Sequence, residues 1–408
     1  MRSTVVLRRR GFSTPSFKRF VTRSFSSSSS SKQLDVPESQ LDASYSTAGS
    51  VDLFASVGNT PLLELTTLSK LTGCKLLAKA EYANPSGSIK DRVAKSLILD
   101  AEERGLLKPG GTIIEATGGS TGVSLALLGA SRGYKTLLTM PDITAKEKVQ
   151  MMKTMGAEVH ILPTTSMSDK ENHFFHVARR LAETTPNSYC PNQFDNVANM
   201  RAHYEGTAPE IWQQVGGEID GFVTSAGTSG TITGMSRFFK EQNPNVKVWL
   251  IDPEETAAMS VFINNDRATS TIEDGFEIVP MAKGSTIAEG VAALSRVTEN
   301  LRESIVDQGI TATNQEIVDM AYFLLRNDGI FVGPSSALNV LGAVKMAREL
   351  GPGHTIVTIL ADGGVRYGSK LYNEEWLTEH NLLPQESATK KGATSLEFVA
   401  KHQFPTSV

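Results

Sequence analysis

Cysteine is scarce in this sequence of 408 residues, which contains only Cys74 and Cys190. Two cysteines in separate segments build neither a disulfide framework nor a structural zinc site. They are typical of a protein from a reducing compartment. We expect both to be buried fillers of the core.

Long apolar runs are also missing, because no stretch reaches the roughly 20 residues that a membrane-spanning helix needs. The sequence therefore predicts no membrane span. With 40% hydrophobic and 21% charged residues, the composition is that of a globular protein. The length allows two domains or one large α/β unit with a sizeable core.

Acidic residues are absent from the first 33 positions, and the first one in the chain is Asp35. The same segment contains eight Lys or Arg residues, and serine fills most of residues 24–31. A basic, Ser-rich and acid-free N-terminus is typical of an organellar transit peptide. We expect residues 1–33 to direct the chain to the mitochondrial matrix; a disordered basic tail without a specific partner is the alternative.

The remainder of the chain is acidic, since removing these eight from the 40 basic residues leaves 32 against 44 acidic ones. The net charge is then near −12. Nucleic-acid binding proteins carry the opposite charge balance, so the sequence predicts no nucleic-acid partner.

Between about residues 51 and 382, short apolar runs alternate with segments of helical periodicity. This alternation predicts parallel sheets with helices on both faces. The apolar runs lie at residues 75–79, 112–114, 136–139, 158–162, 221–224, 246–251 and 355–360, and the helical segments at 91–104, 122–132, 145–155, 209–214, 230–242, 314–327 and 336–350.

Four loops rich in Gly, Ser and Thr precede predicted helices, where ligands bind at the ends of parallel strands. The first, NPSGSIKDR at residues 84–92, places Lys90 in the first turn of a helix, where the dipole opposes a cation. TGGSTG at residues 117–122 offers hydroxyls and backbone N–H groups that suit a carboxylate. GPSS at residues 333–336 follows an expected apolar strand and offers a neutral hydroxyl. Taken singly, a solvated lysine and serine- or threonine-capped turns explain these loops as well.

The remaining loop, GTSGT at residues 227–231, resembles a phosphate cradle at a helix start. It is not a P-loop, and its glycines, with the next at 234, do not match the dinucleotide motif. A monophosphate on a smaller molecule fits better. Pyridoxal phosphate uses all four loops, because it needs an amine, phosphate donors, a partner for its ring nitrogen and a site for the carboxylate of an amino-acid substrate.

The sequence resembles the cysteine synthase and cystathionine β-synthase family of fold-type II pyridoxal phosphate enzymes, and within it a divergent fungal mitochondrial type of cysteine synthase. The resemblance covers residues 58–382 and implies a tryptophan synthase β-like fold of two three-layer αβα domains. It rests on the four loops and on GNTPL at 58–62, NQF at 192–194, EGTAPEIW at 205–212, the turn at 289–290 and RYGSKLYNEEWL at 366–377.

The resemblance implies a role for each loop. Lys90 would bind the cofactor covalently and later move protons, and Ser335 would meet the ring nitrogen. Ser120 stands where the family usually has asparagine at the ring oxygen, and the acid usual before Arg366 is missing. The phosphate would be held by Gly227, Thr228, Ser229, Gly230 and Thr231, and the substrate carboxylate by Thr117, Gly118, Thr121 and Gln193.

The implied reaction is a β-replacement that forms L-cysteine from an O-activated serine, O-acetyl-L-serine, and sulfide or another thiol, through an aminoacrylate intermediate. Alternatives are a cystathionine β-synthase-like condensation of serine with homocysteine, or an idle family member that acts as a binding protein. The resemblance also implies a homodimer, with a small mobile domain at residues 34–57 and 81–195 and a phosphate-binding domain at 58–80 and 196–383. The loss of apolar pattern after Leu383 predicts a surface tail at 384–408.

Overall fold

The computed structural model describes residues 52–265, 267–273, 275–280, 284–291, 295–402 and 404–405. The predicted transit peptide, residues 1–33, lies outside the described residues. So does most of the first part of the predicted small domain, residues 34–57.

The larger sheet has six strands in the order β1-β2-β12-β7-β8-β11. All neighbours are parallel except β1 and β2, which are antiparallel. The strands are β1 (Leu62–Glu64), β2 (Lys75–Ala80), β7 (Gly221–Thr224), β8 (Lys247–Pro253), β11 (Gln308–Ala312) and β12 (Thr355–Leu360).

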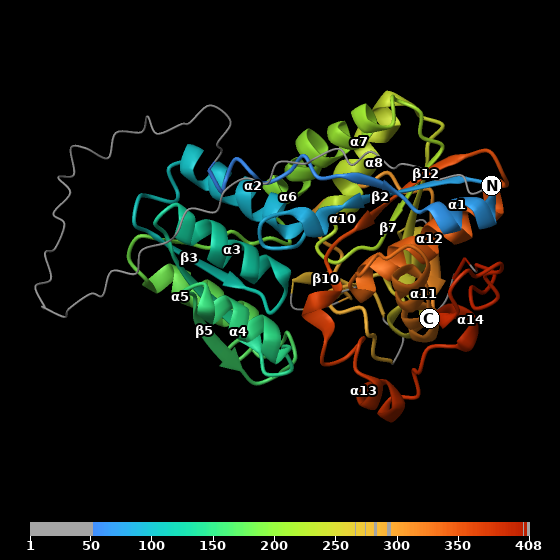
Figure 1. Cartoon of the computed structure of the whole chain (residues 1–408). Helices are drawn as coiled ribbons and strands as arrows, with labels where there is room; N and C mark the ends of the chain where they lie inside the picture. The colour runs from blue at the N-terminus through green and yellow to red at the C-terminus, as the bar shows by residue number, and fades with distance from the viewer. Residues whose placement is uncertain are drawn as a thin grey trace, which may run out of the picture. The chain divides into compact units, whose positions relative to one another are not determined.

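Side chains alternate between the two faces of this sheet, as the period of two along a strand requires. Val223 packs under α11 (Asn314–Asn327) and α12 (Pro334–Leu350), whereas its neighbour Phe222 packs under α7 (Ala208–Gln214) and α8 (Gly230–Gln242). The sheet is thus the middle of three layers (Figure 1). Helix α1 (Thr66–Thr72) joins the first face, and α9 (Met259–Asn264) the second.

The smaller sheet has four parallel strands in the order β5-β4-β3-β6. Ile113 faces α2 (Lys90–Glu103) and α3 (Ser120–Ser131), and Ile114 faces α5 (Phe174–Thr184) on the opposite side. This sheet is also the middle of three layers. Its strands are β3 (Thr112–Ala116), β4 (Lys135–Pro141), β5 (Glu158–Leu162) and β6 (Ser188–Tyr189), and α4 (Lys146–Thr154) packs beside α3.

Shorter elements complete the described chain. A hairpin of β9 (Thr271–Glu273) and β10 (Phe276–Ile278) lies outside both sheets. The other helices are α6 (Val197–Ala202), a π-helix at His203–Thr207, α10 (Glu299–Arg302), α13 (Glu374–Glu379) and α14 (Glu386–Thr389), with 3-10 turns at Glu81–Ala83, Glu254–Thr256 and Gly364–Tyr367.

The predicted parallel sheets with helices on both faces are confirmed, and the predicted runs and helices all occur, with ends shifted by at most two residues. The apolar strand expected before Gly333 is wrong. Val332 forms only an isolated antiparallel bridge to Gly363. The residues near 330 cap the C-terminal end of α11 instead, because the Ile330 N–H donates to the carbonyl of Leu324.

The prediction of a surface tail at residues 384–408 is also wrong. Phe398 and Val399 are buried in the core cluster of α11 and α12, and the Phe398 ring lies 5.6 Å from that of Phe323. Arg348 donates to the carbonyls of Leu396 and Val399 and so fixes this segment. Three apolar residues without periodicity were too weak a signal for burial.

Candidate active site

Lys90 begins α2 directly after β2 and the loop at residues 84–89. Burial of its amino group lowers the pKa of Lys90 to about 8, and the nearby Asp362 carboxyl opposes that shift. Its Nζ lies 3.5 Å from Thr228 Oγ1. A half-buried lysine with this pKa has a substantial neutral fraction near physiological pH, as an amine nucleophile or base requires.

The residues around Lys90 shape its loop. The buried Asp91 carboxylate accepts from the backbone N–H of Ser86 at 2.6 Å and from its hydroxyl. Arg92 forms ion pairs with Glu81 and Glu210, both at 2.7 Å. Asp91 and Arg92 therefore hold the turn and join it to the EGTAPEIW segment, which gives these motif residues a structural role.

The GTSGT loop runs from the end of β7 into α8. A Cβ at Gly227 would lie 2.2 Å from Gly290 O, and one at Gly230 would lie 2.0 Å from Asn199 Oδ1, so neither position has room for a side chain. Ser229 has φ +64°, and its buried hydroxyl has no partner among the described residues. A tight loop with free donors at the start of a 13-residue helix is suited to a phosphate.

Two side chains hold the hydroxyls of this loop. Asn199 Nδ2 donates to Thr228 Oγ1 at 2.8 Å. His203 Nε2 lies 3.2 Å from Thr231 Oγ1, and His203 Nδ1 lies 3.0 Å from Thr207 Oγ1. Complete burial holds the pKa of His203 well below its usual range, so this imidazole is neutral.

The TGGSTG loop joins β3 to α3. Thr121 Oγ1 donates to Gln193 Oε1 at 2.6 Å, so two of the predicted carboxylate-binding residues are in contact. Thr117 Oγ1 accepts from Gly119 N–H at 3.2 Å. A Cβ at Gly118 would lie 2.4 Å from Thr144 Oγ1, so the backbone approaches that side chain closely.

Ser120, the residue that departs from the family pattern, has a charged partner. Its hydroxyl accepts from Arg366 Nη1 at 3.2 Å, and Arg366 also donates to the carbonyl of Ser86 in the lysine loop. Arg366 is buried. The guanidinium therefore connects the lysine loop with the loop that carries Ser120.

The GPSS loop opens α12, and its two serines differ. Ser336 Oγ donates to the carbonyl of Asp362 at 3.1 Å, whereas the Ser335 hydroxyl has no hydrogen-bond partner within the described part of the chain. Asp362 itself is buried; its Oδ2 accepts from Tyr367 Oη at 2.7 Å, and its Oδ1 is unpartnered among the described residues. Burial raises the pKa of Asp362.

The structure brings most of the predicted residues together. Asn199 Nδ2 donates both to Gln193 O and to Thr228 Oγ1, each at 2.8 Å, and so joins the carboxylate side to the phosphate side. Ser335 is linked only indirectly, because it precedes Ser336 at the helix start beside Asp362. The roles of the individual residues stay a prediction. Sequence reasoning missed Asn199, His203 and Asp362, which lie outside the four loops and are buried polar groups without a motif of their own.

These residues fit pyridoxal phosphate. An amine of lowered pKa faces a tight glycine loop that contains the unpartnered Ser229 hydroxyl. A second hydroxyl-rich loop lies on the far side of Asn199. In the part of the chain that the structure describes, no cluster of His, Cys, Asp or Glu forms a metal site. The amine of Lys90 and the glycine loop together suit an organic phosphate cofactor.

Known proteins support this class. The family model for pyridoxal-phosphate dependent enzymes matches residues 53–362. The chain is 48% identical to a cysteine synthase of Dictyostelium discoideum over 81% of this chain and 86% of that one, and 42% identical to cysteine synthase 1 of Neurospora crassa over 81% and 85%. It superposes on the O-acetylserine dependent cystathionine beta-synthase of Helicobacter pylori with a TM-score of 0.67 and 30% identity, covering 79% of this chain and 98% of that one.

The chain therefore belongs to the family of pyridoxal-phosphate dependent enzymes. The predicted cofactor and the fold-type II α/β fold are confirmed.

The phosphate loop generates a prediction. In Gly227→Ala the new Cβ meets backbone at 2.2 Å, so the loop or the Gly290 turn must move. Overpacking of this kind costs about 1–3 kcal/mol, and we expect the affinity for pyridoxal phosphate to fall by roughly 10-fold or more. Fluorescence titration of the cofactor-free protein with pyridoxal phosphate measures this affinity. Gly368→Ala is the matched control because no atom lies within 4 Å of its Cβ; equal affinities of the two variants would contradict the assignment.

Proposed function

We propose that the chain forms L-cysteine from an O-activated serine, O-acetyl-L-serine, and sulfide by β-replacement. The observation that carries the proposal is the contact of Lys90 with a glycine-rich phosphate loop that Asn199 joins to a carboxylate-binding loop. The similarity to proteins named cysteine synthase, at 41–48% identity over most of the chain, supports this choice of reaction.

Bound pyridoxal phosphate supplies a ring that withdraws electrons from the α-carbon of an amino acid. The GTSGT loop and Ser335 would hold its two ends. A neutral serine does not keep a ring nitrogen protonated as a carboxylate would, which favours loss of a β-substituent over full charge delocalisation.

The chain's own residues supply binding and proton transfer. Thr117, Thr121 and Gln193 would orient the substrate carboxylate with hydroxyl and amide donors. Lys90 Nζ would take the α-proton and return a proton later, for which a pKa near 8 suits it. The Arg366 guanidinium beside Ser120 adds positive charge at the position where the family has an amide.

A condensation that forms cystathionine is the second candidate. The Helicobacter pylori relative is named for that product, although it is also named as dependent on O-acetylserine. The cystathionine beta-synthases of Dictyostelium discoideum and mouse are 36% identical to this chain, which spans 65% and 58% of their lengths.

A substrate panel tests the proposal. Purified protein with pyridoxal phosphate is given O-acetylserine, O-phosphoserine or serine, each with sulfide or homocysteine, and cysteine and cystathionine are quantified. We expect cysteine from O-acetylserine and sulfide as the main product. Lys90→Ala should reduce turnover by about 10²–10⁴-fold, whereas Lys95→Ala on the same helix should not.

Two outcomes contradict the proposal in different ways. Cystathionine from serine and homocysteine as the main product would favour the second candidate. Failure of every pair, in a protein that also shows no cofactor absorbance, would favour a binding protein without activity.

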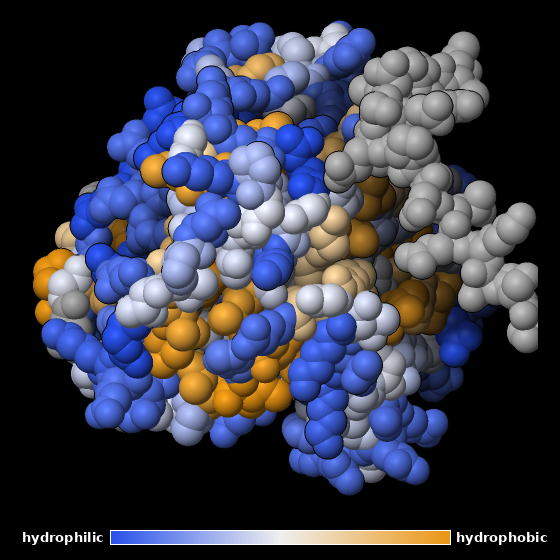
Figure 2. Space-filling model, turned by 90° about the vertical axis from the view of Figure 1, so that its left-hand side faces the viewer, coloured by the Kyte–Doolittle hydropathy of each residue, from blue (hydrophilic) through white to orange (hydrophobic). Residues whose placement is uncertain are grey.

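We also propose that residues 1–33 direct the chain to the mitochondrial matrix and that the chain forms a homodimer. The acid-free, Arg-rich composition supports the first. The side chains of Leu99, Ile143 and Ile161 are exposed, which is compatible with the second. Figure 2 shows apolar surface among polar residues on one face of the molecule. No helix of the described chain is long and apolar enough to cross a bilayer.

A fusion of residues 1–33 to a fluorescent protein should accumulate in mitochondria, and a diffuse signal would contradict the targeting proposal. Sedimentation of the chain without this segment should give twice the mass of one chain, whereas a monomer would contradict the homodimer.

A further inference from the structure

Glu115 is a buried carboxyl group to which none of the predicted site roles applies. It lies near the end of β3 and is 2% exposed. Its Oε2 accepts from the backbone N–H of Asn192 at 2.9 Å, and its Oε1 accepts from that of Gln193 at 3.1 Å. Within the described chain it has no ion-pair partner. A buried carboxylate without a cation is costly to keep.

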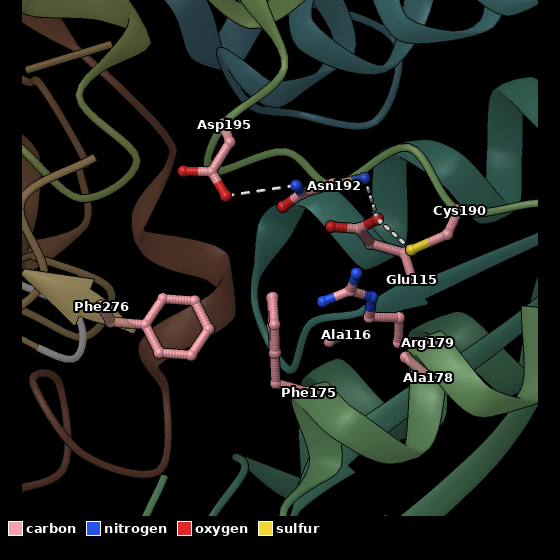
Figure 3. Close-up of a pocket in the computed structure, with 9 residues that line it drawn as sticks. All are labelled: Glu115, Ala116, Phe175, Ala178, Arg179, Cys190, Asn192, Asp195 and Phe276. Atoms are coloured by element: carbon pink, nitrogen blue, oxygen red, sulfur yellow. Dashed lines mark hydrogen bonds between the residues drawn. The ribbon is translucent and has the colours of Figure 1, made fainter. Parts of the chain in front are cut away.

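The backbone that Glu115 binds is held in an uncommon conformation. Asn192 has φ +52°, a left-handed conformation that is uncommon for residues other than glycine, although asparagine adopts it more often than most. Its side chain donates to Asp195 Oδ2 at 3.2 Å, as Figure 3 shows, and Asp195 pairs with Arg296 at 2.6 Å. Two hydrogen bonds to successive N–H groups offset the strain of this turn.

Gln193 connects this turn to the rest of the site. Its side chain accepts from Thr121 Oγ1, and its carbonyl accepts from Asn199 Nδ2. A displacement of the Gln193 backbone would therefore move a side chain of the carboxylate loop and the amide that reaches the phosphate loop.

We propose that Glu115 is the positioning residue for Gln193: its ionised carboxylate fixes the backbone of Asn192 and Gln193, and through it the amide that meets the substrate carboxylate. The role of Gln193 toward a substrate carboxylate rests on the proposed function, whereas the effect of Glu115 on the turn does not.

Protons have access to Glu115, because it borders a cavity of about 290 Å³ that Phe175 of α5 and Phe276 of β10 also line (Figure 3). Burial raises the pKa of Glu115 to about 7; the N–H groups of Gln193 and Asn192 oppose that shift, and the charge of Asp195 adds to it.

Three ionisable groups face Glu115 across this cavity: Asp195, Arg179 of α5 and Cys190. Burial raises the pKa of the Cys190 thiol to about 12, so it stays neutral at physiological pH. Cys190 Sγ lies 4.0 Å from Glu115 Oε2 and is half-buried, which corrects the expectation that both cysteines are buried fillers; Cys74 is buried as expected.

The direction of the pH effect follows from the two hydrogen bonds. Above about pH 7 both oxygens of Glu115 accept. Below it one oxygen is a neutral hydroxyl, which is a weaker acceptor than a carboxylate oxygen, so the hold on the two N–H groups weakens and the turn loosens.

The effect on folding has the opposite sign. The folded pKa lies above the ordinary value of 4.5, so the folded state holds an extra proton between about pH 4.5 and 7. Stability from this group is complete below about 4.5 and is lost as the pH rises through 7. At high pH the turn at residues 192–193 is therefore tighter, but the free energy of unfolding is lower than at acid pH.

The test compares Glu115→Gln and Glu115→Asp with the control Glu102→Gln. Glu102 is a carboxylate of α2 that binds Arg132 and Tyr134 at the surface, away from Gln193. Hydrogen exchange of residues 190–196 is measured at pH 6 and 8, together with kcat and KM for the amino-acid substrate. The variants are compared at each pH, because the substrate's own amine also titrates.

In the wild type and in Glu102→Gln we expect lower protection factors at pH 6 than at pH 8, once exchange is corrected for its base-catalysed intrinsic rate. At pH 8 the KM of Glu115→Gln should be about 10-fold above that of the wild type, and at pH 6 the two should be alike; kcat, which also follows Lys90, should differ far less between the two at each pH. Glu115→Gln should show the acid behaviour at both pH values, and Glu115→Asp should recover part of the pH dependence.

Equal exchange and an equal KM profile in the wild type and Glu115→Gln would overturn the proposal. If Glu115→Gln does not fold, the proposal is tested by the protection factors of the wild type at the two pH values and by those of Glu115→Asp. If the wild type turns over no substrate, the proposed function fails, while the exchange comparison still decides on Glu115.

Discussion

One side-chain amide, that of Asn199, holds the two halves of the site in register. It is fully buried, and its Nδ2 donates at 2.8 Å to Gln193 O on one side and to Thr228 Oγ1 on the other. Gly230 has no side chain because Asn199 Oδ1 occupies that space. Loops from the ends of two separate sheets thus meet at a single residue, so the spacing of the predicted phosphate and carboxylate loops depends on its position.

Burial of charge is the second constraint on this site. It lowers the pKa of Lys90 to about 8 and raises that of Glu115 to about 7, so both groups titrate closer to neutrality than usual; it also raises the pKa of Asp362. By contrast, Arg92 is compensated by two carboxylates, and its pair with Glu210 holds the pKa of that carboxyl at about 2. The fixed pairs support the turn at Lys90, while the uncompensated groups are those that could exchange protons.

The sequence was sufficient for the parts of the site that are local in the chain. Each Gly/Ser/Thr loop contains the small and capping residues that a turn from a strand into a helix requires. Lys90 and the GTSGT loop could therefore be predicted from the sequence alone. The partners of these loops come from distant segments. Arg366 reaches Ser120 across 246 positions, and Asn199 and Glu115 carry no motif, so only the packing of both sheets reveals them. The buried C-terminal segment was missed for the same reason.

The central claim is that Lys90 bears the cofactor. Mass spectrometry that locates the cofactor on the chain tests this most directly. The protein loaded with pyridoxal phosphate is reduced with borohydride, digested and sequenced. The account predicts a stoichiometric pyridoxyl group on the peptide that contains Lys90. A label on another lysine, or none in a protein that binds the cofactor tightly, would contradict it.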